Sequence, residues 1–287
     1  MPPHYLAISR GIVMKKKRKA ILLLIIIVIL IFITLFLPSI KLFINQSMNK
    51  EFIERVNEYA LSANIMIVHI EHNNQENVSL SVSAGSSGVI IGREGDKYYA
   101  LTAEHVISEI EDTENAEIVV LGFDQLDFND HLSKGGKFQG IEDYYQQFPR
   151  AVIEYANEKY DLAIIRFDSD KDYTVLSISE ETPEYGDIVA SMSNPYRERN
   201  IVTAGKVSTL KPRPFGDKAG EMQYPIIRHT AMISEGSSGS ALLNENLEIA
   251  GINLGGGENI FRKFVHGMAM PSDLIHDFLE EWEDKTK

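Results

Sequence analysis

The sequence predicts an all-β domain that is preceded by a membrane-spanning helix and followed by a C-terminal helix. Three observations lead to this fold class: an uncharged apolar run near the N-terminus, many short apolar runs separated by Gly, Pro and Asn, and an apolar stripe at helical spacing near the end. Short strands at close spacing are typical of a β-barrel or a β-sandwich. With 287 residues, 44% of them hydrophobic and 24% charged, the chain is long enough for one globular domain and an extension.

The N-terminal stretch "MKKKRKAILLLIIIVILIFITLFLPSI" predicts a transmembrane helix over residues 20–40. About eighteen residues from Ala20 onward carry no charge, and at the helical rise they cover about 27 Å, close to the hydrocarbon thickness of a bilayer. No small-residue cleavage site follows, so we expect an uncleaved anchor. Residues 15–19 are all basic, which places a cytoplasmic segment at 1–19 and everything after the span outside the cytoplasm. The prediction is a single-pass protein of the cell membrane.

Residues 41–64 are expected to form a helical juxtamembrane segment. Apolar side chains recur there at helical spacing, with the charges on the opposite face. They are Phe52, Ile53, Val56, Tyr59 and Ala60.

The remainder, residues 65–287, is expected to be one globular domain. Its strands are predicted from the period-two or continuously apolar runs "NIMIVHI", "SSGVIIG", "DKYYALT", "AEIVVLGF", "AVIEYA", "DLAIIRF", "DIVASM", "IVTAGKVSTL", "YPIIRHTAMI", "LEIAGINL" and "KFVHGMAM". Residues 123–150 are polar and poorly periodic, and predict a long surface loop. The final "PSDLIHDFLEEW" predicts a helix with Ser272 as its N-cap, docked through Leu274, Ile275, Phe278, Leu279 and Trp282.

Composition argues against several classes of function. A formal net charge of −13 argues against a nucleic-acid partner, because phosphate binding requires a basic face. The chain contains no cysteine, which excludes disulfides, cysteine-ligated zinc and a cysteine nucleophile. The histidines show no spacing typical of metal ligands, so we expect neither a metal nor a cofactor.

Three motifs carry residue types that together suggest acyl transfer. "YYALTAEHVI" places His105 just after a strand, "EKYDLAIIRF" places Asp161 before an apolar strand, and "EGSSGSALL" places serines in a glycine-rich turn. Each motif alone is more often structural. Acyl transfer by a serine needs a base, a carboxylate that orients the base, and backbone N–H groups directed at the developing oxyanion. The three motifs contain all of these groups.

The order His, Asp, Ser, with T-A-x-H, D-L-A and G-x-S-G around these residues, resembles the chymotrypsin-like (trypsin-like) serine peptidases. Longer stretches, among them "GSSGVIIGREGDKYYALTAEHVI" and "EGSSGSALLNENLEIAGINL", resemble the HtrA (Deg) branch over about residues 65 to 280. The resemblance implies a double six-stranded β-barrel with the site between the barrels. It implies His105 as general base, Asp161 as its orienting partner and Ser238 as nucleophile, with the N–H groups of Gly236 and Ser238 forming the oxyanion hole.

The resemblance also implies a primary specificity pocket between "TAMI" and "GINL". Its residues would be Met232, Gly251, Ile252 and Asn253, and none of them is acidic. We therefore expect cleavage after small or medium apolar residues. The "GSSGS" turn also resembles glutamyl endopeptidases of the same superfamily, for which His229 or His266 would contact a glutamate side chain.

The function implied is a membrane-anchored serine endopeptidase acting on protein or peptide substrates, in extracytoplasmic protein quality control or regulatory proteolysis. The alternative is a catalytically silent binding or scaffold module on the same fold. The sequence leaves a homo-oligomer open. From the short distance between Trp282 and the end of the sequence, we expect this protein to have no PDZ domain, which is usual in HtrA proteins.

Overall fold

The computed structural model describes residues 49–71, 81–82, 85–111, 116–138, 140–209, 213–214, 225–258, 261 and 263–286. The chain divides into two compact units, residues 1–50 and 51–287, and nearly all described residues belong to the second. No helix within these ranges is long and apolar enough to cross a membrane. The predicted span at residues 20–40 lies outside the described residues.

The second unit begins with a helix that packs on the domain core. An α-helical stretch passes into a π-helical turn, η1 (Val56–Ala60), and a 3-10 turn, η2 (Leu61–Ala63). Phe52, Val56 and Ala60 are buried in the main core, whereas Tyr59 is 58% exposed. The wide π-helical turn keeps positions four apart on one face, which leaves Tyr59 outside the predicted stripe.

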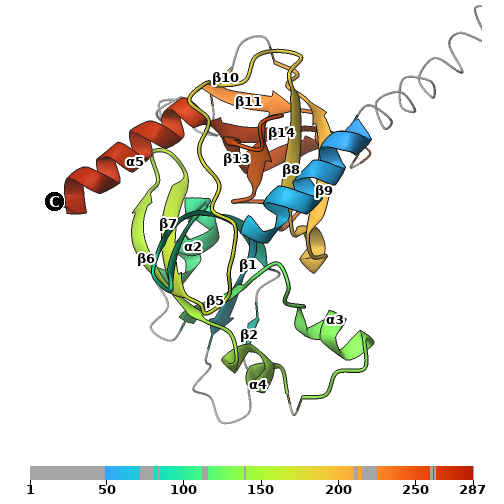
Figure 1. Ribbon diagram of the computed structural model, residues 1–287, viewed down its shortest axis with the longest axis vertical. Helices are drawn as coiled ribbons and strands as arrows, with labels where there is room; N and C mark the ends of the chain where they lie inside the picture. Colours follow the sequence, from blue (N-terminus) through green and yellow to red (C-terminus); the bar gives the residue numbers. More distant parts are fainter. Residues whose placement is uncertain are drawn as a thin grey trace, which may run out of the picture. The chain divides into compact units, whose positions relative to one another are not determined.

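The first sheet closes into a six-stranded barrel with a two-residue strand at its side (Figure 1). Its order is β1-β3-β4-β7-β6-β5, and β5 pairs back to β1 from Met66 opposite Leu121 to Glu71 opposite Ala116. The strands are β1 (Asn64–Glu71), β2 (Ser81–Val82), β3 (Ser86–Glu94), β4 (Lys97–Thr102), β5 (Ala116–Leu121), β6 (Arg150–Asn157) and β7 (Leu162–Asp168).

The second sheet has the order β10-β11-β14-β13-β12-β8-β9, and a bridge between Val207 and His229 joins its two ends. It is therefore also a six-stranded barrel with one short extra strand, β10, among the described residues. The strands are β8 (Ile188–Ser193), β9 (Ile201–Lys206), β10 (Arg213–Pro214), β11 (Pro225–His229), β12 (Ala241–Leu243), β13 (Ile249–Glu258) and β14 (Phe264–Pro271).

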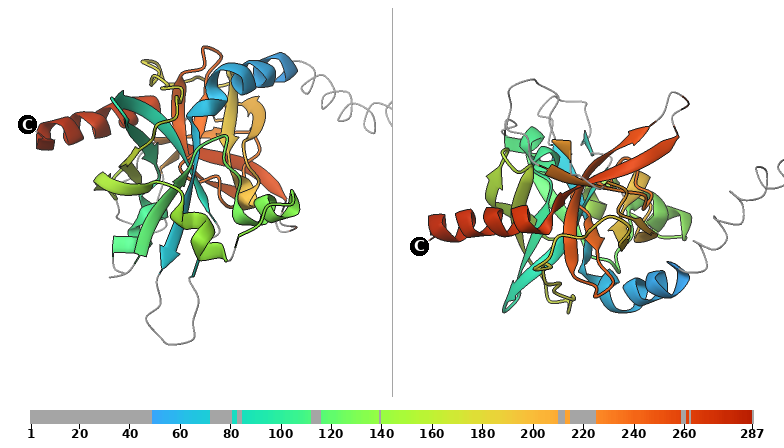
Figure 2. Two further views of the ribbon diagram at one scale, coloured as in Figure 1. Left: turned by 60° about the horizontal axis from the view of Figure 1, so that its bottom comes forward. Right: turned by 90° about the horizontal axis from the view of Figure 1, so that it is seen from above.

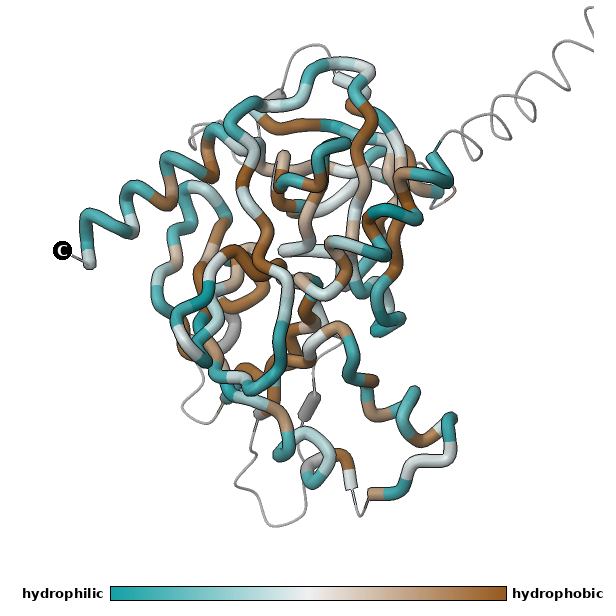
Figure 3. Tube along the Cα trace, viewed as in Figure 1, coloured by the Kyte–Doolittle hydropathy of each residue, from teal (hydrophilic) through white to brown (hydrophobic). Residues whose placement is uncertain are grey.

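One apolar core runs through both barrels. It joins residues of the first, such as Ile90 and Ile164, to residues of the second, such as Met192 and Ile252. Figure 3 shows the apolar stretches concentrated inside the domain where the strands cross. The segment between the barrels, residues 169–187, is tied to both, since Leu176 N–H donates to Ile90 and Ser179 N–H donates to Ile249.

The C-terminal helix α5 (Ser272–Thr286) follows the second barrel and packs against the first, as Figures 1 and 2 show. Phe278 is fully buried and its ring stacks on Tyr155 at 5.1 Å between centroids. Ile275 is also buried, and Trp282 packs at the edge of the core, so the predicted apolar stripe is confirmed. The predicted N-cap is wrong: Ser272 Oγ is buried without a hydrogen-bond partner, so it makes no capping bond.

Residues 123–150 are more ordered than the predicted surface loop. They contain two short helices, α3 (Phe128–Ser133) and α4 (Ile141–Gln146), visible beside the first barrel in Figure 1. Tyr144, Tyr145 and Phe148 are buried in a small separate core with strand residues of the barrel. With Ile141, which packs against them, these residues have the i, i+3, i+4, i+7 spacing of an amphipathic helix. The pattern lasts only two turns inside a polar segment, and the prediction of a loop missed it.

Candidate active site

His105 lies at the second position of α2 (Glu104–Glu111), three residues after β4 ends at Thr102. Asp161 immediately precedes β7, which pairs with β4. This pairing explains how residues 56 positions apart meet. The His105 ring Nδ1 lies 2.8 Å and 2.9 Å from the two carboxylate oxygens of Asp161, and the His105 backbone N–H donates to Oδ1 at 2.9 Å.

The hydrogen bonds of this pair determine which tautomer the neutral His105 imidazole adopts. An ionised carboxylate only accepts hydrogen bonds, so Nδ1 carries the proton and Nε2 is left with its lone pair. The Asp161 side chain is 13% exposed and that of His105 is 45% exposed. The base is therefore open to a substrate, while its orienting partner is covered.

The conformation of the serine-bearing turn requires glycine at position 236. Ser237 N–H donates to Ser234 O at 2.9 Å and Gly236 has φ of +90°, the geometry of a type II β-turn with glycine at its third position. A Cβ on Gly236 would lie 2.8 Å from Asn194 O, so no larger residue fits. The motif thus requires glycine there for both conformation and space.

Ser238 lies on this turn, beside the segment that leads to His105. Its carbonyl accepts from Ser87 N–H of β3 at 3.0 Å, and its Oγ donates to Leu254 O at 3.3 Å. A Cβ on the next residue, Gly239, would lie 2.9 Å from Ala103 N, two residues before His105. The structure thus brings the Ser238 turn against the chain segment that carries the histidine.

Two backbone amides at this turn are available to a ligand. Within the described part of the chain, neither Gly236 N–H nor Ser238 N–H donates to another protein group. The carbonyl of the preceding residue, Glu235, accepts from Tyr196 N–H at 2.8 Å. Because C=O and N–H point in opposite directions across a trans peptide, the Gly236 N–H points away from Tyr196.

A network of buried polar groups under the turn contains one of the predicted pocket residues. Asn253 is fully buried; its carbonyl accepts from Gly239 N–H at 2.8 Å, and its amide nitrogen donates to Ser240 Oγ at 2.9 Å and Ser191 Oγ at 3.1 Å. Its side-chain oxygen therefore accepts from His229 Nε2 at 2.9 Å. Burial lowers the pKa of His229 to about 4, so this histidine is neutral.

The cavity beside Ser238 has a volume of about 220 Å³. Ile233 and Phe264 supply its apolar wall, and Glu235 and Glu258 are exposed carboxylates among its lining. The full lining is Ile233, Ser234, Glu235, Ser237, Ser238, Gly255, Gly256, Gly257, Glu258 and Phe264.

None of the four residues predicted for the pocket lines this cavity. Met232 is 59% exposed, Gly251 is buried in β13, Ile252 belongs to the core and Asn253 supports the serine turn. The cavity instead uses the residue that follows Met232 and the glycine run that follows "GINL". That run, which lacks side chains at three successive positions, was the sequence signal for an open space at this edge.

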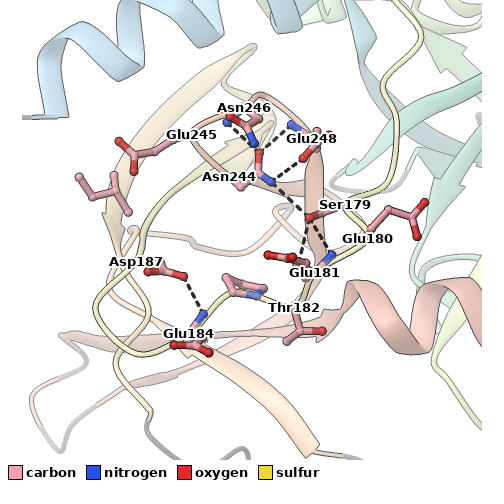
Figure 4. A pocket seen from close by; sticks show the side chains of 12 residues that line it. Ser179, Glu180, Glu181, Thr182, Glu184, Asp187, Asn244, Glu245, Asn246 and Glu248 are labelled. Atoms are coloured by element: carbon pink, nitrogen blue, oxygen red, sulfur yellow. Dashed lines mark hydrogen bonds between the residues drawn. The ribbon is translucent and has the colours of Figure 1, made fainter.

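A second cavity, of about 960 Å³, contains none of the predicted catalytic residues. Figure 4 shows that carboxylates of the 180–187 and 244–248 segments line it, and that several polar groups bond within it. Asn244 Nδ2 donates to Glu248 at 2.9 Å, and Glu184 N–H donates to Asp187 at 2.7 Å. Among the described residues, no group of three His, Asp or Glu side chains could hold a metal ion.

Comparison with known proteins also indicates a peptidase. Residues 86–252 match the model of the trypsin-like peptidase domain family. The chain is 27% identical over 208 residues to the serine endoprotease DegS of Haemophilus influenzae, an alignment that covers 72% of this chain and 52% of DegS.

Two mammalian relatives are similar over a shorter stretch. Serine protease HTRA4 of Mus musculus is 32% identical and serine protease HTRA3 of Homo sapiens 34% identical, each over 140 residues that cover 47% of this chain. The matched region spans about half the length of DegS and under a third of the other two relatives. By its fold, its serine turn and the match over residues 86–252, the chain belongs to the trypsin-like peptidase family.

Proposed function

We propose that this protein is a membrane-anchored serine endopeptidase that cleaves proteins or peptides outside the cytoplasm. The observation that carries the proposal is the bonding of His105 to Asp161, together with a serine turn in which the N–H groups of Gly236 and Ser238 donate to no described protein group. These are the base, the orienting carboxylate and the oxyanion donors that acyl transfer requires.

In the proposed mechanism Ser238 Oγ attacks the carbonyl carbon of the scissile peptide bond. Its proton passes to His105 Nε2, for which Oγ must exchange its bond to Leu254 O for one to the imidazole. Asp161 stabilises the imidazolium that forms, and the N–H groups of Gly236 and Ser238 bind the oxyanion. The imidazolium then protonates the leaving amine. Water, deprotonated by His105, hydrolyses the acyl-enzyme and restores the Ser238 hydroxyl.

The small cavity beside Ser238 supports cleavage after small or medium apolar residues. Ile233 and Phe264 form its apolar wall, and its charged lining residues are two exposed carboxylates, Glu235 and Glu258, with no cation among them. Of the two histidines that a glutamate-specific site could use, His229 is buried, neutral and bonded to Asn253. The other, His266, is paired with Gly257 on the neighbouring strand and is not among the lining residues. The structure thus favours an apolar over an acidic side chain in this cavity.

The membrane anchor and the cytoplasmic N-terminus are proposed from the sequence. The basic run at residues 15–19 and the uncharged stretch that follows it support this topology. A protease held at the outer face of the cell membrane would meet misfolded or membrane-bound proteins, which is consistent with quality control or regulatory proteolysis.

A fluorophosphonate probe, which reacts with activated serines, tests the proposal on purified protein. We expect the wild type and Ser237→Ala to be labelled and Ser238→Ala not to be labelled, because among the three serines of this turn only Ser238 has glycine two residues before and one after. The same preparations, given a peptide library, should cleave after apolar residues only when Ser238 is present. If folded wild-type protein is never labelled, the silent scaffold takes the place of the protease.

A further inference from the structure

The loop between β8 and β9 carries unusual backbone strain close to the serine turn. Tyr196, Arg197 and Asn200 have φ of +50°, +65° and +61°, in the left-handed region that disfavours residues other than glycine. Residues with side chains are strained in this region, and the conformation persists only where the surroundings enforce it. Something must therefore hold residues 196–200 in place.

The Arg199 guanidinium supplies that restraint. Its Nη2 donates to Gly122 O at 2.7 Å and to Leu121 O at 3.2 Å, and its Nε donates to Gln125 O at 3.1 Å. Its Nη1 donates to Asn194 Oδ1 at 2.7 Å. Three of the four acceptors are main-chain carbonyls at and after the end of β5, in the first barrel. Arg199 thus joins a loop of the second barrel to the first barrel.

All four hydrogen-bond acceptors of the Arg199 guanidinium are uncharged oxygens of carbonyl or amide groups. Burial lowers the pKa of Arg199 to about 10, which still leaves the guanidinium charged near neutral pH. Arginine presents five N–H groups in a rigid planar fork, whereas lysine has one ammonium centre. Four acceptors in different directions therefore match arginine and not lysine.

The restrained loop in turn contacts the oxyanion peptide. Asn194 Oδ1, which Arg199 binds, also accepts Asn200 N–H at 3.1 Å and so fixes the end of the loop. At its start, Tyr196 N–H donates to Glu235 O at 2.8 Å. This bond sets the direction of the Glu235–Gly236 peptide and hence of the Gly236 N–H.

We propose that Arg199 is a positioning residue for the oxyanion hole: by anchoring the strained 196–200 loop to the first barrel, it keeps the Gly236 N–H directed at the reacting carbonyl. The inference rests on the proposed function, because it assigns a role within the same site. Arg199 touches neither Ser238 nor His105, so its effect reaches the reaction through Tyr196 and Glu235.

The test compares Arg199→Met and Arg199→Lys with a matched control, Arg150→Met. Arg150 also donates to two main-chain carbonyls, those of Tyr145 and Phe148, but these lie at the end of α4, away from the 196–200 loop. We expect Arg199→Met to lower kcat by about 10- to 100-fold, somewhat less than the loss of an oxyanion donor, with KM changed less than twofold. The rate of fluorophosphonate labelling should fall in parallel. Arg150→Met should keep kcat within twofold even if its melting temperature falls.

Several results would overturn the assignment. A folded Arg199→Met protein with wild-type kcat would do so, as would a loss confined to KM or an equal loss of kcat in Arg150→Met. If Arg199→Met does not fold, Arg199→Lys decides: a lowered kcat at unchanged KM supports the role and a wild-type kcat removes it. Failure of the wild type itself to label would instead refute the proposed function, and the two failures are therefore distinguishable.

Discussion

Asp161 combines a positive φ of 51° with two hydrogen bonds to His105. Aspartate tolerates the left-handed region better than most residues, although it is still strained there. Holding the carboxylate at this angle lets one side chain bind both the backbone N–H and the ring Nδ1 of His105. The local backbone and the proposed catalytic geometry therefore depend on the same residue.

Asp161→Asn should lower kcat/KM by about 10⁴, the loss typical when the carboxylate of a serine protease triad becomes an amide. Asparagine has nearly the same shape but can offer an N–H to Nδ1, which stabilises the wrong tautomer of His105. Peptide hydrolysis by the purified variant measures the effect, with circular dichroism to confirm folding. A loss of less than tenfold would mean that His105 does not depend on this carboxylate.

His229 predicts a pH dependence of stability. Burial lowers its pKa to about 4, from about 6.5 in an unfolded chain. Between these values the unfolded protein binds more protons than the folded one, so this contribution to stability is complete above pH 6.5 and is lost as the pH falls toward 4. The fall in pKa from about 6.5 to about 4 corresponds to a loss of about 3 kcal/mol.

Urea unfolding at pH 7 and pH 4.5 checks this prediction when wild type and His229→Gln are compared. The difference between the two proteins removes the contribution of the carboxylates that both share. The unfolding free energy of the wild type should fall by about 2–3 kcal/mol more than that of the variant. Equal falls would show that His229 is not the titrating group.

At the scale of elements, the serine turn depends on close packing between the barrels. A Cβ on Gly239 would meet Ser87 O and Thr102 Oγ1 of the first barrel, and the residue also has φ of +81°. The hairpin between β3 and β4 offers a contrast: Gly95 has φ of +64° but open space around it. Both glycines therefore have a positive φ, but only Gly239 is packed so closely that a Cβ would clash with its neighbours.

Gly239→Ala should therefore abolish hydrolysis, because either the turn or the facing strands must move. Gly95→Ala should cost about 1 kcal/mol of stability, the strain of alanine in the left-handed region, and leave kcat unchanged. Thermal unfolding and peptide hydrolysis of both variants separate the two effects. Wild-type hydrolysis by Gly239→Ala would contradict the packing that places the turn against Thr102.

At the scale of the whole molecule, the proposed membrane topology can be tested with single introduced cysteines, because the natural sequence contains none. Val152, 50% exposed on β6, and Lys17, in the basic run, provide one reporter position on each side. A membrane-impermeant maleimide should label Val152→Cys in intact spheroplasts and Lys17→Cys only after lysis. Labelling of Lys17→Cys in intact spheroplasts would reverse the proposed orientation.

The β-rich fold class followed from local sequence patterns, whereas the double barrel was implied only by the family resemblance. Apolar periodicity predicted the β-rich domain and the stripe of α5, because strand and helix faces repeat within a few residues. The glycine spacing predicted the serine turn, since Gly236 and Gly239 need a conformation that other residues disfavour. Such constraints act between near neighbours, and the sequence by itself therefore determined them.

Only the tertiary structure decided the remaining features of the site. The cavity lining, the buried role of Asn253 and the anchoring by Arg199 depend on contacts between residues far apart, 74 positions in the bond of Arg199 to Gln125. Which carbonyl or ring faces a side chain at that separation is set by how two barrels close and pack together. No local spacing records it, because the same residues could form the same strands in another register.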